Sequence, residues 1–203
     1  LESRIDTVGF HQDSAYISAQ FEPYENNSVT LWMALDDADE ETGCVEYATG
    51  SHQWRPILHK KEAREDQQVT ALDTDTNETD DNEISSFHSS DETSYRDGLA
   101  LAGRLADIAN PINTIEPAPV REGYAILHNQ DTWHGSGPNR SSIRHRRALV
   151  AHYVRGDVTF RASAHERSPF GHASYIYGRY KRYNSLDLDE SFFPVIHGEN
   201  RTA

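Results

Sequence analysis

Cysteine is nearly missing from this chain of 203 residues, since Cys44 is the single one. An intramolecular disulfide therefore cannot form, which favours a reducing compartment. Long apolar runs are missing too, because no stretch approaches the ~18 consecutive apolar residues that a helix across a bilayer needs. No secretory signal is visible either. The chain begins at Leu1 rather than at Met, so we expect further sequence upstream. The expected location is cytoplasmic, with a peroxisomal one left open.

Positive charge is also scarce. The chain has 19 Lys and Arg against 33 Asp and Glu, which gives a formal net charge of -14. Nucleic acids and anionic membrane surfaces attract basic patches on proteins. We therefore expect no nucleic-acid partner and no membrane partner, and the sequence indicates no particular oligomeric state.

Much of the acidity lies in residues 62–97, which are poor in apolar groups over long stretches. Such a segment buries too little surface to offset the entropy lost on ordering. We expect a mobile acidic insertion at about 62–97 within a single domain that spans residues 1–203. A lid or partner-binding loop and a merely solvated loop both fit this composition.

The rest of the chain has the composition of an all-β protein. Four segments are rich in β-forming residues and end at Gly, Asn, Asp or Pro, a pattern typical of a sandwich or barrel. One helix is expected at about 98–110, from the spacing of its leucines. The four expected strands are Val29–Leu35, Cys44–Thr49, Tyr124–His128 and Ala148–Val154.

Two motifs carry the chemistry. In His11-Gln-Asp13 an imidazole and a carboxylate lie two residues apart, so in an extended segment both point to one face and can bind one metal ion. Trp133-His134 can add a second histidine from a distant strand. Two histidines and one carboxylate that leave adjacent positions open are typical of non-haem Fe(II) oxygenases. His128 is an alternative to His134.

Several blocks of sequence resemble those of the phytanoyl-CoA dioxygenase family. The resemblance implies an all-β core folded as a double-stranded β-helix (a jelly roll, cupin-like) with few flanking helices. Family members usually carry further residues before the His-x-Asp motif, and these contribute to the pocket. The resembling blocks are Phe10–Tyr16, Trp32–Asp37, Glu41–Cys44, Gly50–His52, His134–Asn139, Arg146–Leu149 and Leu188–Pro194.

The resemblance also implies roles for individual residues. His11, Asp13 and His134 match the ligands of a catalytic Fe(II) ion. These three residues would hold the metal at the reacting centre.

Three further residues match contacts to the cosubstrate 2-oxoglutarate. Arg146 matches the arginine that pairs with its distal carboxylate, because a guanidinium offers a planar fork of donors. Ser136 matches a hydroxyl contact to the same carboxylate, and Trp32 matches an aromatic wall of the pocket. The spacing from His134 is one residue longer than expected, so Arg144 is an alternative to Arg146.

The expected function is hydroxylation of an unactivated C–H bond of a small molecule or an acyl thioester by O2, with release of succinate and CO2. The alternative is a non-catalytic β-helix protein that binds a metal or ligand without turnover. A halogenase on the same scaffold is disfavoured, because Asp13 fills the position that a halide would need.

Overall fold

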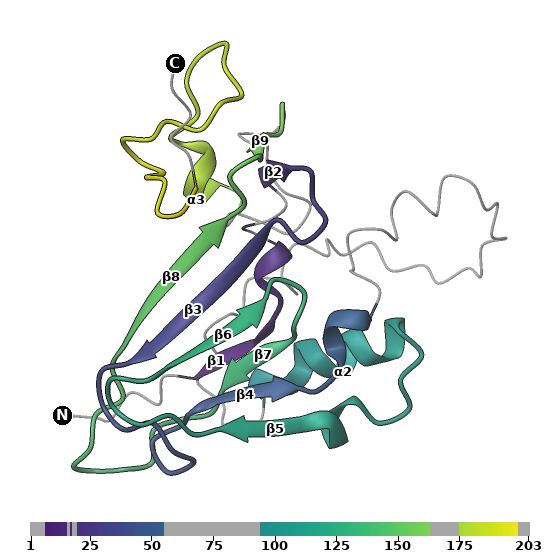
Figure 1. Ribbon diagram of the computed structural model, residues 1–203. Helices are drawn as coiled ribbons and strands as arrows, with labels where there is room; N and C mark the ends of the chain where they lie inside the picture. Colours follow the sequence, from purple (N-terminus) through teal and green to yellow (C-terminus); the bar gives the residue numbers. More distant parts are fainter. Residues whose placement is uncertain (1–6, 16, 18–19, 55–93, 163–174, 199–203) are drawn as a thin grey trace, which may run out of the picture. The chain divides into compact units, whose positions relative to one another are not determined.

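The computed structural model describes residues 7–15, 17, 20–54, 94–162 and 175–198 (Figure 1). No helix within these ranges is long and apolar enough to cross a membrane. Contacts divide the chain into two compact units. The first draws on Leu1–Gln12, Ala34–Tyr124 and Asp131–Arg147, and the second on Asp13–Met33, Ala125–Gln130 and Ala148–Ala203.

The first unit is built on a four-stranded sheet. Its strands pair antiparallel, and β7 lies between β1 and β4. In this register His134 lies opposite His11 on one side and opposite Tyr47 on the other. The strand order is β1 (Val8–His11), β7 (His134–Ser136), β4 (Val45–Ala48) and β5 (Ile115–Ala118).

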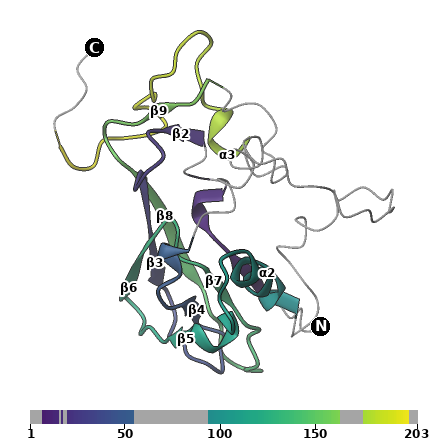
Figure 2. The same cartoon turned by 90° about the vertical axis from the view of Figure 1, so that its right-hand side faces the viewer.

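One face of this sheet is covered by helix α2 (Asp97–Leu105), which lies beside β1 in both views (Figures 1 and 2). Phe10 and Leu99 meet in a buried cluster with Trp133. The packing is tight at Gly135, where a Cβ atom would lie 2.8 Å from the Phe10 ring and 2.8 Å from the Val8 carbonyl oxygen. Only glycine fits there, which explains the residue after His134.

The second unit contains a three-stranded sheet in the order β6 (Ala125–Asn129), β3 (Ser28–Ala34) and β8 (Ala148–Val154). Strand β3 alternates between buried and half-buried residues, as expected of a strand with one face on the core. Its buried face carries Thr30 and Trp32.

A separate aromatic core supports the second unit. The short strands β2 (Phe21–Glu22) and β9 (Thr159–Phe160) pair antiparallel, with Phe21 opposite Phe160. The two rings lie 5.2 Å apart between centroids and are fully buried. Phe193 packs edge-on against both rings, and α3 (Tyr175–Gly178) adds Tyr177 to the cluster.

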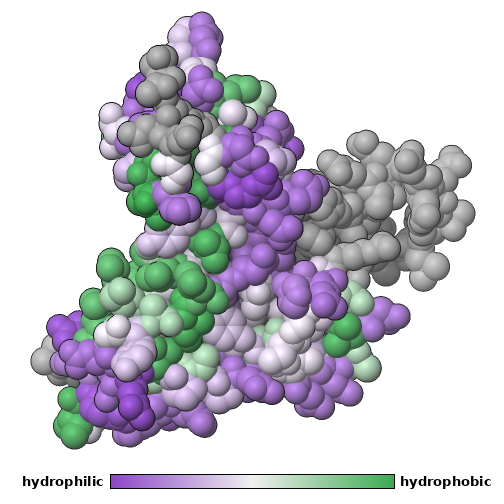
Figure 3. Space-filling model, in the orientation of Figure 1, coloured by the Kyte–Doolittle hydropathy of each residue, from purple (hydrophilic) through white to green (hydrophobic). Residues whose placement is uncertain are grey.

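The other face of the β6-β3-β8 sheet carries exposed apolar side chains. Leu127 is 64% exposed and Leu149 54% exposed. Hydrophobic residues also gather over this sheet in the space-filling view (Figure 3). The sheet therefore has apolar side chains on both faces, unlike an antiparallel sheet with one polar, solvated face.

The expected strands agree closely with the structure. Strand β8 has the predicted bounds, and β3, β4 and β6 each differ from prediction by one residue at either end. The observed helix is shorter than the expected one: α2 ends at Leu105, and Asp107 takes a left-handed φ of 60°.

Most of the predicted acidic insertion lies outside the described residues. Its last residues, 94–97, belong instead to the 3-10 turn η5 (Ser94–Arg96) and the start of α2, with Tyr95 buried. The prediction of a mobile acidic insertion at about 62–97 stays a prediction. The prediction that residues 1–203 form a single domain stays a prediction.

Replacing Leu99 by Ala should destabilise the first unit by about 2–5 kcal/mol, because this α2 side chain is fully buried and its loss leaves a cavity. Thermal and urea unfolding would measure the change. Leu149→Ala is the matched control, since its side chain is mostly exposed and should cost much less. Equal losses in the two variants would contradict this packing.

Candidate metal centre

The two motif histidines face each other across a strand pair. His11 ends β1, and the antiparallel register places it opposite His134, the first residue of β7. Their ring centroids are 4.3 Å apart at an interplanar angle of 52°. Phe10, the neighbour of His11, packs into the cluster under α2. Since side chains alternate along a strand, the histidines belong to the sheet face opposite that cluster.

Each imidazole is oriented by a hydrogen bond to the backbone carbonyl two residues before it. His11 Nδ1 lies 2.7 Å from the carbonyl oxygen of Gly9, and His134 Nδ1 lies 2.9 Å from that of Thr132. A carbonyl can only accept, so each Nδ1 carries the hydrogen and each Nε2 keeps a lone pair. Metal-binding histidines are commonly fixed in this way by a backbone carbonyl.

Asp13 supplies the carboxylate. Only Gln12 separates it from His11, so the chain keeps the two Cα atoms within about 7 Å of each other. One potential ligand atom from each of His11, Asp13 and His134 lies within 4.8 Å of the others. The three residues that the sequence singled out as ligands are thus the three that come together.

Asp13 is buried, and its carboxylate has its own partners within the second unit. Its Oδ2 atom accepts a hydrogen bond from the Thr30 hydroxyl and lies 3.1 Å from His128 Nε2. His128 was the alternative to His134 as a ligand. In the structure it is a neighbour of the Asp13 carboxylate.

Each of the three predicted cosubstrate residues lies on a strand or just before one. Ser136 follows His134 by two residues on β7 and therefore shares its face. Its hydroxyl oxygen is buried and has no hydrogen-bond partner among the described residues. Trp32 is 8% exposed and lies on the same face of β3 as Thr30. Arg146, just before β8, is half-buried.

The two neighbouring arginines, Arg144 and Arg147, form ion pairs with carboxylates of the protein. Arg144 binds Asp39 at 2.6 Å and Glu41 at 2.5 Å, and its hydrogen bond lowers the pKa of Asp39 to about 2. Arg147 binds Asp36 at 2.7 Å and lowers the pKa of that carboxyl too. Arg144, the alternative to Arg146, therefore already binds two carboxylates of the protein.

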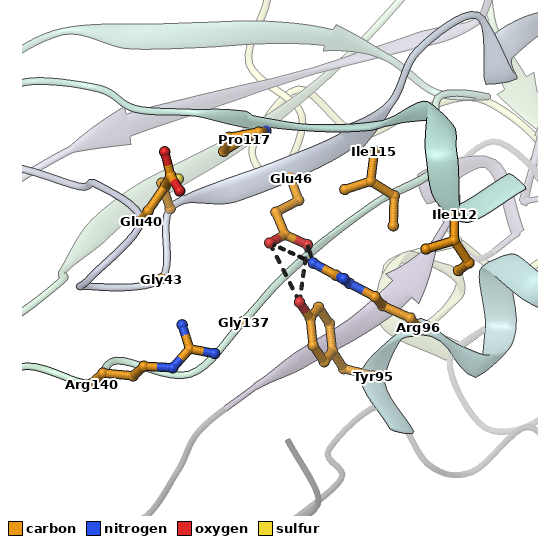
Figure 4. Close-up of a pocket in the computed structure, with 11 residues that line it drawn as sticks. Glu40, Gly43, Glu46, Tyr95, Arg96, Ile112, Ile115, Pro117, Gly137 and Arg140 are labelled. Carbon is orange, nitrogen blue, oxygen red and sulfur yellow. Dashed lines mark hydrogen bonds and ion pairs between the residues drawn. The ribbon is translucent and has the colours of Figure 1, made fainter. Parts of the chain in front are cut away.

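A cavity of about 330 Å³ lies on the other face of β4 (Figure 4). Glu46 points into it and accepts hydrogen bonds from Tyr95 at 3.1 Å and Arg96 at 2.9 Å. Burial, with the charge of Glu46, raises the pKa of Tyr95 to about 12. Tyr47 points the opposite way and packs on His134, at 5.9 Å between centroids. The cavity is therefore separated from the histidine pair by the sheet.

A sequence comparison identifies the family of the chain. The profile described as "Phytanoyl-CoA dioxygenase (PhyH)" matches residues 5–148, which is more than half of the chain. The chain belongs to the phytanoyl-CoA dioxygenase family. The predicted all-β jelly roll with few helices is confirmed by this membership together with the mostly antiparallel strands.

The individual proteins that resemble this phytanoyl-CoA dioxygenase family member share less than a third of their aligned residues with it. A Stutzerimonas stutzeri protein named "Probable alpha-ketoglutarate-dependent hypophosphite dioxygenase" is 28% identical over 153 residues, which are 74% of this chain and 41% of that protein. The epimerase SnoN in complex with Fe3+, alpha ketoglutarate and nogalamycin RO aligns with a TM-score of 0.47 and 18% identity, over 80% of this chain and 48% of SnoN. EvdO2 from Micromonospora carbonacea var. aurantiaca, complexed with 2-oxoglutarate, aligns with a TM-score of 0.39 and 21% identity, over 74% of this chain and 48% of EvdO2. The chain spans less than half the length of each.

Sequence motifs did not indicate every residue around the family's ligand positions. Thr30 and His152 both lie outside the motifs that the sequence analysis singled out. Thr30 Oγ1 in fact lies 2.9 Å from His152 Nδ1. The alternation of β3 could have signalled Thr30, because a threonine between buried positions of a strand needs a partner for its hydroxyl.

Replacing His11, Asp13 or His134 by Ala should each remove tight binding of Mn(II), a redox-stable probe for the site. Isothermal titration calorimetry would measure the affinity, and circular dichroism would check that the β-fold is kept. His52→Ala is the control, since this histidine is exposed in the turn Ser51–Gln53. Wild-type Mn(II) affinity in Asp13→Ala would show that the ligand set is wrong.

Proposed function

We propose that this phytanoyl-CoA dioxygenase family member is an Fe(II)- and 2-oxoglutarate-dependent oxygenase. The observation that carries the proposal is the pair of facing histidines, each oriented by a hydrogen bond from Nδ1 to a backbone carbonyl, with a potential ligand atom of Asp13 within 4.8 Å of theirs. Two imidazoles and one carboxylate suit Fe(II) and leave positions open for a chelating cosubstrate and O2. The 2-oxoglutarate dependence stated in the name of the Stutzerimonas stutzeri relative supports the same cosubstrate.

The residues of the chain fit 2-oxoglutarate. A buried hydroxyl without a partner costs free energy, so the Ser136 hydroxyl needs an acceptor such as a carboxylate. Arg146 would pair with the distal carboxylate, because a guanidinium can donate two parallel hydrogen bonds to it. Trp32 would form an apolar wall and exclude water, which strengthens that ion pair.

The proposed reaction hydroxylates an unactivated C–H bond of a small molecule or an acyl thioester. One oxygen atom of O2 enters the product alcohol and the other enters succinate, while the C1 carboxylate of 2-oxoglutarate leaves as CO2. Bound iron would supply the activation of O2. His11, Asp13 and His134 would hold the metal, and the cosubstrate contacts would orient 2-oxoglutarate toward it.

Formation of the cosubstrate complex tests this proposal directly. Anaerobic addition of Fe(II) and 2-oxoglutarate should give a weak visible charge-transfer band, and admission of O2 should release succinate. A panel of acyl thioesters, small metabolites and hypophosphite would then show which compound stimulates succinate release. Metal binding with neither band nor succinate would instead support the alternative, a non-catalytic binding protein.

Arg146→Leu should weaken 2-oxoglutarate binding by roughly 2–5 kcal/mol, the usual cost of removing one partner of a desolvated charge pair. Arg146→Lys should recover only part of the loss, because an ammonium cannot form the two-pronged contact. Calorimetric titration of 2-oxoglutarate into the Mn(II)-loaded protein would measure both.

Two neighbouring arginines serve as controls. Arg144→Leu and Arg147→Leu should change 2-oxoglutarate affinity little, because these side chains bind Asp39 and Asp36. A large loss in Arg144→Leu with unchanged affinity in Arg146→Leu would move the cosubstrate contact to Arg144.

A further inference from the structure

We propose that Thr30 and His128 are positioning residues that orient the Asp13 carboxylate toward the metal, and that His152 acts on it through Thr30. The inference rests on the proposed function, because it takes Asp13 as a ligand. All four residues lie in the second unit, and Asp13, Thr30 and His128 are buried. Neither Thr30 nor the two histidines belong to the ligand set itself.

The hydrogen bonds that link His152, Thr30 and His128 to Asp13 all donate toward the Asp13 carboxylate. The Thr30 hydroxyl has a single hydrogen, which it donates to Asp13 Oδ2. The 2.9 Å contact between Thr30 Oγ1 and His152 Nδ1 therefore needs the hydrogen on His152. His128 Nε2, at 3.1 Å, donates to the same Oδ2 atom. A chain from His152 through Thr30, and a second donor from His128, thus end on one carboxylate oxygen.

This convergence has a consequence for metal binding. Two donors on Oδ2 lower the electron density that this oxygen can offer to a cation, so Oδ1 is the better ligand atom. The donors also fix the rotation of the carboxyl group, which is 1% exposed. Hydrogen bonds of this kind set the orientation of metal ligands, and their loss commonly lowers metal affinity about 10–100-fold.

Strand geometry supports a role beyond packing. Thr30 lies opposite His128 in the β3–β6 register, and both residues are buried. An apolar pair at these positions would fill the same space without burying polar atoms, which cost free energy unless they are paired. The two strands instead bring two donors to the carboxylate that follows His11 by two residues.

A threonine series tests the proposal. Thr30→Val keeps the shape of the side chain and removes the hydroxyl, whereas Thr30→Ser keeps the hydroxyl. Calorimetric titration with Mn(II), without 2-oxoglutarate, should show an affinity loss of about 10–100-fold for Thr30→Val and a value near wild type for Thr30→Ser. Thr159→Val, on β9 of the same unit, is the matched control and should bind as wild type.

A spectroscopic measurement separates positioning from a general loss of stability. At saturating Co(II), the visible absorption of Thr30→Val should differ from that of wild type, because the orientation of the carboxylate changes the ligand field. Thr30→Ser should restore the wild-type spectrum. Wild-type Mn(II) affinity and an unchanged Co(II) spectrum in a folded Thr30→Val protein would overturn the proposal.

Histidine variants decide the matter if Thr30→Val does not fold. His128→Leu should lower Mn(II) affinity, and His128→Gln, which keeps a donor, should recover part of it. Equal, wild-type affinity in both would overturn the proposal. Asp13→Ala separates this result from the proposed function: if it abolishes Mn(II) binding while the Thr30 and His128 variants bind normally, only the positioning role fails. If Asp13→Ala still binds Mn(II), the ligand set itself is wrong.

Discussion

The antiparallel pairing of β1 with β7 is the constraint on which the candidate site depends. It sets His11 opposite His134, although the two residues are more than a hundred positions apart in sequence. A slip of one residue in this register would turn one imidazole to the other face of the sheet. The tight contact at Gly135 opposes such a slip, because the glycine leaves room for the Phe10 ring and the Val8 carbonyl.

The same sheet separates two polar environments. On the face of Tyr47 the histidines offer neutral donors to a cation, whereas on the opposite face Glu46 is balanced by Arg96 and Tyr95. The half-buried Glu46 pairs its charge with Arg96 within the first unit. Electrostatic complementarity there stabilises the contact of η5 with β4.

Much of the fold was predictable, because alternating and β-branched segments mark strands without knowledge of their partners. The proximity of His11, Asp13 and His134 was predictable from the order of two motifs. The hydrogen bonds around Asp13 were not, since they join Thr30, His128 and His152, which come together only through strand register. The ion pairs of Arg144 with Asp39 and Glu41 also depend on the path of a loop, which the spacing of residues in the sequence does not determine.

The carbonyl contacts of the two histidine Nδ1 atoms span only two residues each, so they form with the local backbone and need no ion. The imidazole donors are therefore set before loading, unlike sites whose metal drives folding. The intrinsic affinity of such nitrogen and oxygen donors for divalent ions rises from Mn(II) through Fe(II) to Cu(II). Occupancy by Fe(II) rather than a tighter-binding ion is then decided by which metals the surroundings supply.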